Sequence, residues 1–408
     1  TSFFSSSQVD EDEAEFDDMD SILDDCISLS MPSHYLTWHY RSKHESLIKF
    51  SNMNYYDGKL FTFPSIDDRM SKVRLVHVDG TYDKGKTRSN QAEACAIVSE
   101  IMRRLKDEKL SQRSIGVVSF SQVQQNLIED MLTDELNNYP ELKQKAFQGD
   151  ERIFIKNLEN VQGDERDVIL FSIGYGPDKK GNVSMNFGPL NNKGGERRLN
   201  VAVSRARYEM IIYSTLCAEQ IDLKRTKSKG VEGLKDFLAF AERRTIDSPV
   251  TTVGLKNKRN LITLIANEIT DRGYKVDTLV GSSNFKVDMA VVDPDNANKY
   301  ILGILCDGKN YYETKTTRDR EIVQPRVLSM LHWNVMRVWS VDWYENKENV
   351  INRIMSKLND IKHSSAECCH SEQQFASNIK NNVFIINNES VVKQVNDCEI
   401  EYVFADIA

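Results

Sequence analysis

Four arginines lie close together in residues 197–208, whose sequence is RRLNVAVSRARY. They are Arg197, Arg198, Arg205 and Arg207. The guanidinium group is planar, and its fork of donors matches two phosphate oxygens at once. The apolar residues between the arginines are spaced as at the start of a helix. The segment is therefore either a phosphate-binding site or a helix with one solvated basic face.

The same segment resembles the last signature motif of superfamily 1 helicases. In that motif the arginine after the Ser/Thr reaches the γ-phosphate of an ATP that is bound mainly to a neighbouring domain. Arg205 occupies this position here. The resemblance implies that Arg205 acts as an arginine finger, which offsets the charge that develops on the transferred phosphoryl group.

Residues 36–60, LTWHYRSKHESLIKFSNMNYYDGKL, resemble an earlier segment of that family. There, a Tyr-Arg pair is followed by a helix and then by an aromatic-x-Gly-x-Leu turn. Arg41 matches the second phosphate-sensing arginine of the family, and His39 stands where Gln is common. The alternative is an amphipathic helix with a structural Arg41. The joint match of the pair and the turn favours the phosphate role.

Residues 162–165 resemble the fifth motif of the family, which links the nucleotide site to the nucleic-acid track. The resemblance implies that Gln162 and Gly163 belong to the nucleotide site and that Glu165 contacts the nucleotide sugar. Gly163 also permits a positive φ. Gln124 is the best match to a family glutamine near a strand end, so we expect it to bind nucleic acid. The alternative for residues 162–163 is a plain βαβ connection.

Strands and helices are expected to alternate through this part of the chain. The expected strands are residues 73–78, 114–121, two within 152–175, and 210–215, with a helix at 90–107. Such alternation predicts an α/β fold with a parallel sheet and helices on both faces. This agrees with a second RecA-like helicase domain, which we place at residues 31–247.

Residues 80–87, GTYDKGKT, fit the spacing G-x-x-x-x-G-K-[ST] of a phosphate loop, but they belong to a polar stretch that we expect to be a plain loop between the strand at 73–78 and the helix at 90–107. In superfamily 1 helicases that loop and the acidic Mg²⁺ motif belong to the first RecA-like domain, which would precede Thr1. The resemblance therefore implies that ATP is shared with a missing N-terminal helicase domain. We expect the chain alone not to hydrolyse ATP at a helicase rate.

A different pattern begins after Ser248-Pro249. We expect a helix at 259–273, strands at 274–280, 286–293 and 300–313, a basic helix from about 316, a strand at 334–340 and a helix from 345. This αβββαβα order resembles the PD-(D/E)xK nuclease fold, that is, a restriction-endonuclease-like domain. Residues 255–343 more narrowly resemble the Vsr-like endonuclease domain that some bacterial helicases carry, which predicts a domain at 250–360.

The nuclease resemblance implies that Asp288 and Asp307 are metal ligands. They would hold Mg²⁺, which polarises the scissile phosphate and generates hydroxide. Asp288 lies in one expected strand and Asp307 follows the next, so the two side chains could meet at one end of the sheet. Lys309 completes an Asp-x-Lys motif and would orient the nucleophile or stabilise charge. Glu268, on the first helix, is a further catalytic candidate.

Two residues depart from the nuclease family. Leu305 stands where Glu is common, and Tyr312 stands near a position where His is common. Since an aliphatic side chain cannot ligate a metal, the alternative is a degenerate nuclease fold that binds DNA without cutting it. Arg318 and Arg320 are expected to hold backbone phosphates.

The combined hypothesis is the C-terminal part of a superfamily 1 helicase fused to a Mg²⁺-dependent DNA endonuclease. ATP-driven translocation on a single-stranded track would deliver duplex DNA for cleavage. The resemblance suggests five-prime to three-prime movement and a role in bacterial defence or repair. An RNA helicase fragment is a further alternative, because the RecA-like motifs do not separate RNA from DNA.

Composition sets outer limits on this hypothesis. The chain has 408 residues, which predicts two or three domains. Residues 10–25 hold ten acidic residues, and removing them from the net charge of −8 leaves +2, so we expect residues 1–30 to be an acidic flexible segment. Seven unpatterned cysteines and the lack of a long apolar run predict a cytoplasmic protein without a membrane partner. Residues 361–408 are a tail or the start of a further domain.

Overall fold

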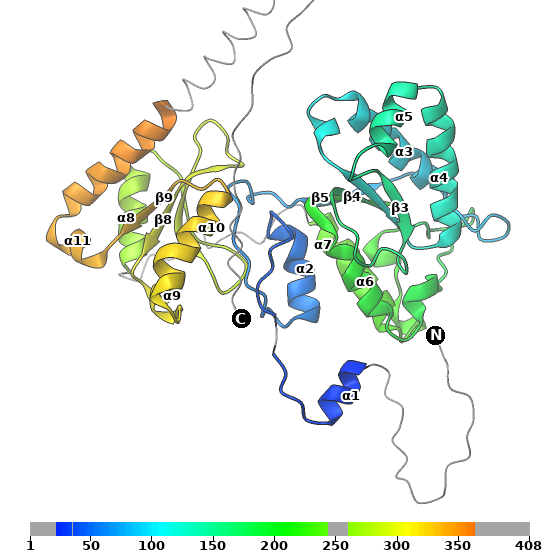
Figure 1. Ribbon diagram of the computed structural model, residues 1–408, viewed down its shortest axis with the longest axis horizontal. Coiled ribbons are helices and arrows are strands. Elements are labelled where there is room, and N and C mark those ends of the chain that lie inside the picture. The colour runs from blue at the N-terminus through cyan, green and yellow to red at the C-terminus, as the bar shows by residue number, and fades with distance from the viewer. Residues whose placement is uncertain (1–21, 35, 244–259, 364–408) are drawn as a thin grey trace, which may run out of the picture. The chain divides into compact units, whose positions relative to one another are not determined.

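The computed structural model describes residues 22–34, 36–243 and 260–363. Residues up to Ile351 form one compact unit, which contains two sheets (Figure 1). Of the expected acidic segment, Ile22–Ser28 forms helix α1, while residues 1–21 lie outside the described residues. Most of the expected tail also lies outside them. Within the described ranges, every helix is too short or too polar to cross a bilayer.

The first sheet has five strands in the order β1-β5-β4-β2-β3, all parallel. They are β1 (Val73–His77), β2 (Ile115–Ser119), β3 (Phe154–Asn157), β4 (Arg166–Ser172) and β5 (Ala206–Ser214). Strand β2, which lies between β4 and the edge strand β3, is buried along its whole length. Parallel strands covered on both faces are continuous apolar runs, as in this sequence. The expected RecA-like α/β architecture is therefore confirmed.

Helices cover both faces of the first sheet (Figure 1). One face packs against α3 (Gln91–Lys106), α4 (Gln122–Asn137) and α5 (Pro140–Phe147). The other packs against α2 (Ser46–Tyr55), α6 (Gly195–Val203) and α7 (Lys229–Glu242). Side-chain caps fix where two helices begin: Asn90 accepts the amide of Glu93 before α3, and Ser121 accepts the amide of Gln124 before α4.

The second sheet has the order β6-β7-β8-β9. Its elements are α8 (Leu261–Asp271), β6 (Val276–Val280), β7 (Val287–Val292), β8 (Tyr300–Cys306), α9 (Lys309–Glu313), α10 (Gln324–Met330), β9 (Val335–Val338) and α11 (Ser340–Glu345), followed by helical residues 347–363. Strands β6, β7 and β8 are antiparallel, and β9 runs parallel to β8. This matches the expected αβββαβα order.

One expected element of this part is wrong in its bounds. The strand expected over residues 300–313 ends at Cys306, where its pairing with β9 also ends. Residues 309–313 form α9 instead. The basic helix expected from about 316 is confirmed, since helical residues begin at 317 and pass through a π-helical turn, Asp319–Val323, into α10.

A segment distant in sequence completes the hydrophobic core of the second sheet. Residues 61–69, which we call the strap, follow the turn after α2. Phe63 and Ile66 pack against this core, and the ring centroids of Phe63 and Phe285 are 4.5 Å apart. The amide of Tyr300, at the start of β8, donates to the carbonyl of Ile66 over 2.7 Å. The strap is thus structurally part of the second sheet, although its sequence lies next to α2.

Buried hydrogen bonds fix the strap at two further points. The indole N–H of Trp333 donates to the carbonyl of Pro64 over 2.7 Å. The hydroxyl of Ser283 donates to the carbonyl of Thr62 over 2.8 Å and accepts the amide of Thr62 over 3.2 Å. Leaving any of these buried groups unpaired would cost about 1–3 kcal/mol, so the strap is held in one register.

A buried carboxyl lies where α2, the strap and the second sheet meet. Glu45 accepts the amide of Ser282 over 2.8 Å and a short hydrogen bond from the hydroxyl of Thr62. Burial, with a contribution from nearby Asp68, raises its pKa from an ordinary 4.5 to about 7. Glu45 is therefore largely protonated below neutral pH.

Replacing Glu45 with glutamine is expected to weaken the dependence of stability on pH. Between pH 4.5 and 7 the folded state retains a proton on Glu45 that the unfolded chain releases. The contribution of Glu45 is thus complete below pH 4.5, falls as pH rises through 7, and changes by about 3 kcal/mol. The measurement is urea unfolding across this range. The exposed Glu232→Gln is the control, and a Glu45→Gln curve parallel to the wild type would contradict the assignment.

Candidate functional site

Arg205 lies in the short link between α6 and β5. Its Nε donates to the carbonyl of Val201 over 2.6 Å, and its Nη2 donates to the hydroxyl of Ser204 over 3.1 Å. Both partners are neutral oxygens in the last turn of α6 or directly after it. The guanidinium is therefore held in place without its charge being cancelled by a direct carboxylate partner.

Arg41 and Glu165 lie beside this link. The Nε of Arg41 donates to Oε2 of Glu165 over 2.5 Å, and its Nη1 donates to the carbonyl of Ser204 over 3.4 Å. Glu165 directly precedes β4, and Arg205 directly precedes β5. Because β4 and β5 are parallel neighbours, their beginnings meet at the same edge of the sheet. The fold thus brings together three residues that the sequence separates by more than 120 and by 40 positions.

The electrostatics of this edge favour an anion. Burial lowers the pKa of Arg205, and repulsion from the nearby Arg41 lowers it further. Burial and the same two arginines lower the pKa of His39 to about 4. His39 is therefore neutral at pH 7, and its Nε2 accepts the amide of Ser42 over 3.1 Å. Two guanidiniums near one carboxylate suit a ligand that carries several negative charges, such as a triphosphate.

Gln162 and Gly163 form an exposed turn before Glu165. Gly163 has a φ of +90°, as expected from its sequence context, and a Cβ there would meet no heavy atom within 4 Å. Glycine at this position therefore serves the backbone conformation and leaves the turn open for close approach. The nucleotide contacts expected of Gln162, Gly163 and Glu165 remain predictions.

The second candidate site is built around Asp288, on β7. Its side chain is only 3% exposed. It accepts the backbone amide of Cys306 over 2.7 Å and the side-chain amide of Asn310 over 3.1 Å. Burial raises its pKa to about 6, against the lowering effects of these hydrogen bonds and of Arg337. Asp288 is thus ionised at pH 7 despite its burial.

Asp307 follows β8 and is held by Ser340, the first residue of α11. Its two carboxylate oxygens accept the amide of Ser340 over 2.8 Å and the hydroxyl of Ser340 over 2.7 Å. The negative charge of Asp307 contributes to the raised pKa of Asp288. The two aspartates predicted from the sequence therefore lie near each other at the end of β8.

The cation whose charge acts on Asp288 is not the expected one. Lys309 lies on α9, is largely exposed and pairs with Glu313 over 3.5 Å. Arg337 lies on β9, paired in register with Leu305 of β8, and its charge lowers the pKa of Asp288. The position predicted for Lys309 is therefore corrected, because the chain turns into α9 instead of continuing the strand.

Comparisons with known families assign both parts of the chain. Residues 19–216 match the model of an AAA domain, AAA_12, and residues 263–358 match the REase_MTES_1575 family. The chain joins a helicase-type AAA domain to a restriction-endonuclease-like domain. Each match covers the residues of one candidate site, with the arginines in the AAA domain and the aspartates in the restriction-endonuclease-like domain.

Several helicases are similar to this chain over part of their length. An uncharacterized ATP-dependent helicase of Mycoplasma genitalium is 29% identical over 348 residues, 79% of this chain and 29% of that protein. The DNA polymerase alpha-associated DNA helicase A of Saccharomyces cerevisiae is 25% identical over 45% of this chain and 27% of that protein. The chain thus spans less than a third of these relatives. A crystal structure of the C-terminal domain of a possible DNA helicase from Lactobacillus plantarum WCFS1 aligns at 10% identity and a TM-score of 0.25, over 43% of this chain and 86% of that one.

Gln124 of the AAA domain is buried completely, which corrects its expected role in nucleic-acid binding. Its amide accepts the backbone N–H of Asn90 over 2.8 Å and donates to the Asn90 carbonyl and to the hydroxyl of Ser172. A side chain engaged in this way cannot reach a strand at the surface. Gln124 instead ties α4 to the start of α3 and to the end of β4.

Glu268 of the restriction-endonuclease-like domain does not join the aspartates. It lies on α8, where it pairs with Arg272 over 2.9 Å and makes a short ion pair with Lys347. Within the ranges that the structure describes, no three acidic, histidine or cysteine side chains are grouped as metal ligands. The predicted metal site is therefore limited to Asp288 and Asp307, and Glu268 is a helix-packing residue.

The arginines expected at the nuclease site differ in environment. Arg318 is exposed. Arg320 is half-buried, with its guanidinium stacked on the ring of Tyr311 at 4.7 Å, and its carbonyl accepts a hydrogen bond from Arg337. Arg337 also stacks on Tyr311, at 5.1 Å. The sequence analysis gave Arg337 no role, because its effect on Asp288 depends on the pairing of β9 with β8.

Proposed function

We propose that this chain supplies the second RecA-like half of an ATP-dependent DNA helicase together with a DNA endonuclease. The observation that carries the proposal is the convergence of Arg41, Glu165 and Arg205 at one edge of the AAA domain. The helicase relatives support it. The coupling of translocation to cleavage, and a setting in bacterial defence or repair, are parts of the same proposal.

The chain's own role in ATP hydrolysis follows from this geometry. Arg205 is preorganised by two neutral acceptors, and Arg41 lies close enough to lower its pKa. Their charges would stabilise the transferred phosphoryl group of an ATP presented by another RecA-like domain, and Arg205 would do so without leaving its two acceptors. Glu165 would release Arg41 when the nucleotide arrives.

Asp288 and Asp307 would hold the Mg²⁺ of the endonuclease. Each carboxylate accepts two hydrogen bonds from the protein, and a carboxylate offers about four lone-pair sites. One or two carboxylates are the usual protein share of a Mg²⁺ site, with water and phosphate completing it. When bound, the ion would polarise the scissile phosphate. Arg337 would offset charge beside Asp288.

Replacing Asp288 with asparagine is expected to lower Mg²⁺-dependent DNA cleavage at least about hundredfold, because even partners of metal ligands matter by 10–100-fold. DNA binding should be retained. The measurements are cleavage of labelled duplex and single-stranded DNA with Mg²⁺, and binding in its absence. Asp295→Asn, in the exposed turn before β8, is the control. Cleavage by Asp288→Asn at the wild-type rate would remove Asp288 from the site.

A second candidate function is DNA binding without cleavage. It is favoured by the pairing of Lys309 with Glu313 and by Leu305, which is 5% exposed and packs in the core of the second sheet. The same assay separates the two functions. A wild-type protein that binds DNA but does not cut it with Mg²⁺ establishes the second, and a preference for RNA in the binding assay would indicate an RNA helicase.

A further inference from the structure

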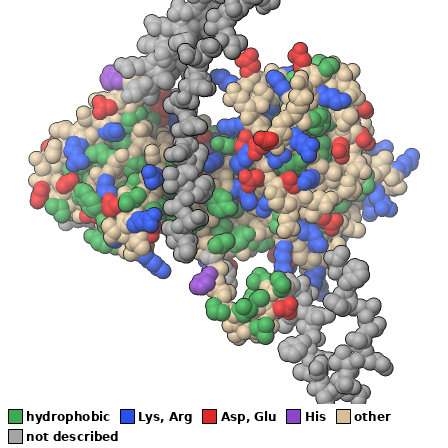
Figure 2. Space-filling view, in the orientation of Figure 1, with side chains coloured by type: hydrophobic (Ala, Val, Ile, Leu, Met, Phe, Trp, Pro, Cys, Tyr) green, Lys and Arg blue, Asp and Glu red, His purple; other side chains and the backbone are tan. Residues whose placement is uncertain are grey.

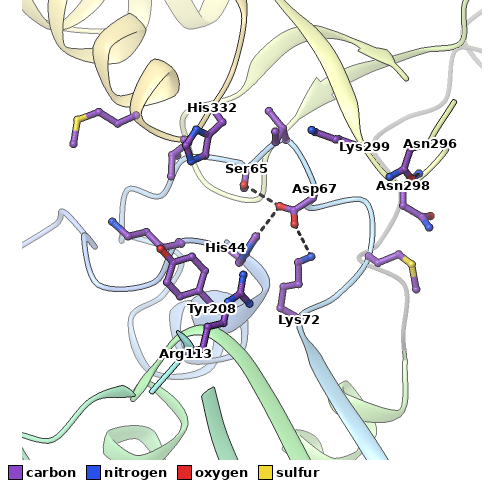
Figure 3. Close-up of a pocket in the computed structure, with 15 residues that line it drawn as sticks. His44, Ser65, Asp67, Lys72, Arg113, Tyr208, Asn296, Asn298, Lys299 and His332 are labelled. Carbon is purple, nitrogen blue, oxygen red and sulfur yellow. Dashed lines mark hydrogen bonds and ion pairs between the residues drawn. The ribbon is translucent and has the colours of Figure 1, made fainter. Parts of the chain in front are cut away.

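A cavity outside both candidate sites is lined by three parts of the chain. It has a volume of about 630 Å³, within the range of ligand pockets. Figure 3 shows Arg113 and Tyr208 entering it from the AAA domain, Asp67 from the strap, and Lys299 and His332 from the restriction-endonuclease-like domain. Neither the arginines of the helicase site nor the aspartates of the nuclease site line this cavity.

The charge of the cavity differs from that of the chain. Its lining contains Lys43, Lys72, Arg113 and Lys299 but one carboxylate, Asp67. The whole chain, in contrast, has a net charge of −8. The face in Figure 2 carries lysine, arginine and acidic side chains intermixed. A local excess of positive charge in an acidic protein favours an anionic ligand at this place.

The carboxylate of Asp67 is already bound by neighbouring side chains. It accepts from Lys72 over 2.7 Å and from the hydroxyl of Ser65 over 3.0 Å, and it lies 3.2 Å from Nδ1 of His44 (Figure 3). Although burial alone would lower the pKa of His44, hydrogen bonds to Asp67 and Asp68 raise it. The only carboxylate in the lining is therefore neutralised by the protein itself.

Three cations remain for a ligand. Lys43, Arg113 and Lys299 are exposed, and none of them pairs with a carboxylate among residues 22–34, 36–243 and 260–363. Arg113 is held over the ring of Tyr208, with 4.7 Å from its Cζ to the ring centroid. Because Arg113 covers this ring, Tyr208 positions the guanidinium and is not a platform for stacking a base.

We propose that this cavity binds the phosphate backbone of single-stranded nucleic acid. The inference rests on the proposed function, since it assigns the same substrate a further contact. Three cations from separate segments suit successive phosphates of one strand better than a single free phosphate ion. Phosphates carry no sequence information, so contacts from these three cations predict binding that is independent of base sequence. The cavity would hold the strand across the AAA and restriction-endonuclease-like domains.

The test compares two double variants of the full chain. Lys43→Gln/Lys299→Gln removes two cavity cations, and Lys143→Gln/Lys145→Gln removes two exposed lysines of α5 as the matched control. Binding of a fluorescein-labelled oligothymidylate is followed by anisotropy over a range of salt concentrations. Each phosphate contact on a single strand contributes about 0.7 to the slope of log K against log salt. The cavity variant should lose about 0.7 per lysine and bind several-fold more weakly, while the control stays at the wild-type slope.

The possible outcomes are distinct. If the wild type binds the oligonucleotide and both variants match it in affinity and slope, the cavity proposal is overturned while the proposed function stands. If the wild type does not bind the oligonucleotide, the cavity proposal and the proposed function both fail. Inorganic phosphate, added at constant ionic strength, separates the two sources of phosphate. In one outcome, phosphate weakens oligonucleotide binding by the wild type but not by the cavity variant, while the two proteins bind the oligonucleotide equally well without it. That outcome would assign the cavity to free phosphate and overturn the strand proposal.

Discussion

Replacing Arg205 with alanine is expected to lower ATP turnover by about a thousandfold or more, the range measured for loss of an arginine finger. The chain would be joined to a RecA-like domain that carries a phosphate loop, and kcat would be measured with DNA present. The effect is large because Arg205 is held by Val201 and Ser204 before the ligand arrives. Arg41, which is paired with Glu165, would supply only part of the transition-state stabilisation that is lost with Arg205.

Two companion variants make this prediction specific. Arg205→Lys keeps the charge but not the planar fork, so it should restore little of the lost rate. Arg197→Ala removes an exposed arginine from the same motif and should leave kcat within a few-fold of the wild type. Equal losses in Arg205→Ala and Arg197→Ala would show that general basicity matters and not a positioned finger.

The sequence indicated where this site lies, but not which partners its arginines would meet. Residue type alone does not distinguish the four arginines of residues 197–208. In the structure Arg207 is engaged by Asp167 over 2.8 Å and by Glu151 over 2.6 Å, which raises its pKa. Arg205 meets neutral oxygens instead. The difference depends on partners that lie 40 and 56 positions away in the sequence, and no local pattern encodes it.

In the restriction-endonuclease-like domain, too, the sequence predicted the elements but not the contacts of a side chain at the end of a strand. The order of elements could be predicted because β7 and β8 are short apolar runs between polar turns. The role of Lys309 could not, since the Asp-x-Lys motif points its lysine at the aspartates only if the strand continues past Cys306. Here α9 begins at Lys309, and the charge that lowers the pKa of Asp288 is that of Arg337 on β9. The cation that acts on Asp288 therefore depends on the pairing of β9 with β8 and not on the Asp-x-Lys motif.

The strap had no sequence signal at all. Residues 61–69 have neither helical nor strand periodicity, and their partners lie more than 200 positions further along the chain. The domain boundary at Ser248-Pro249 therefore assigned them to the AAA domain alone. The structure shows that the second sheet depends on them, which has a consequence for stability that can be measured.

Replacing Trp333 with alanine is expected to lower the free energy of unfolding by about 3–5 kcal/mol, the usual cost of truncating a buried Trp. The side chain is 4% exposed, its ring stacks on that of Tyr300 at 5.4 Å, and a Cβ on Gly303 would come within 2.9 Å of it. Its indole N–H also satisfies the carbonyl of Pro64. The alanine variant therefore loses core packing and a contact with the strap together.

Two further variants divide these contributions. Trp333→Phe keeps most of the apolar area but leaves the Pro64 carbonyl unpaired, so it should cost about 1–3 kcal/mol. Tyr344→Ala removes an aromatic side chain that is 73% exposed and should change stability by less than about 0.5 kcal/mol. Urea unfolding followed by circular dichroism measures all three. If Trp333→Ala were no more destabilising than Tyr344→Ala, the strap would not be a structural part of the second sheet.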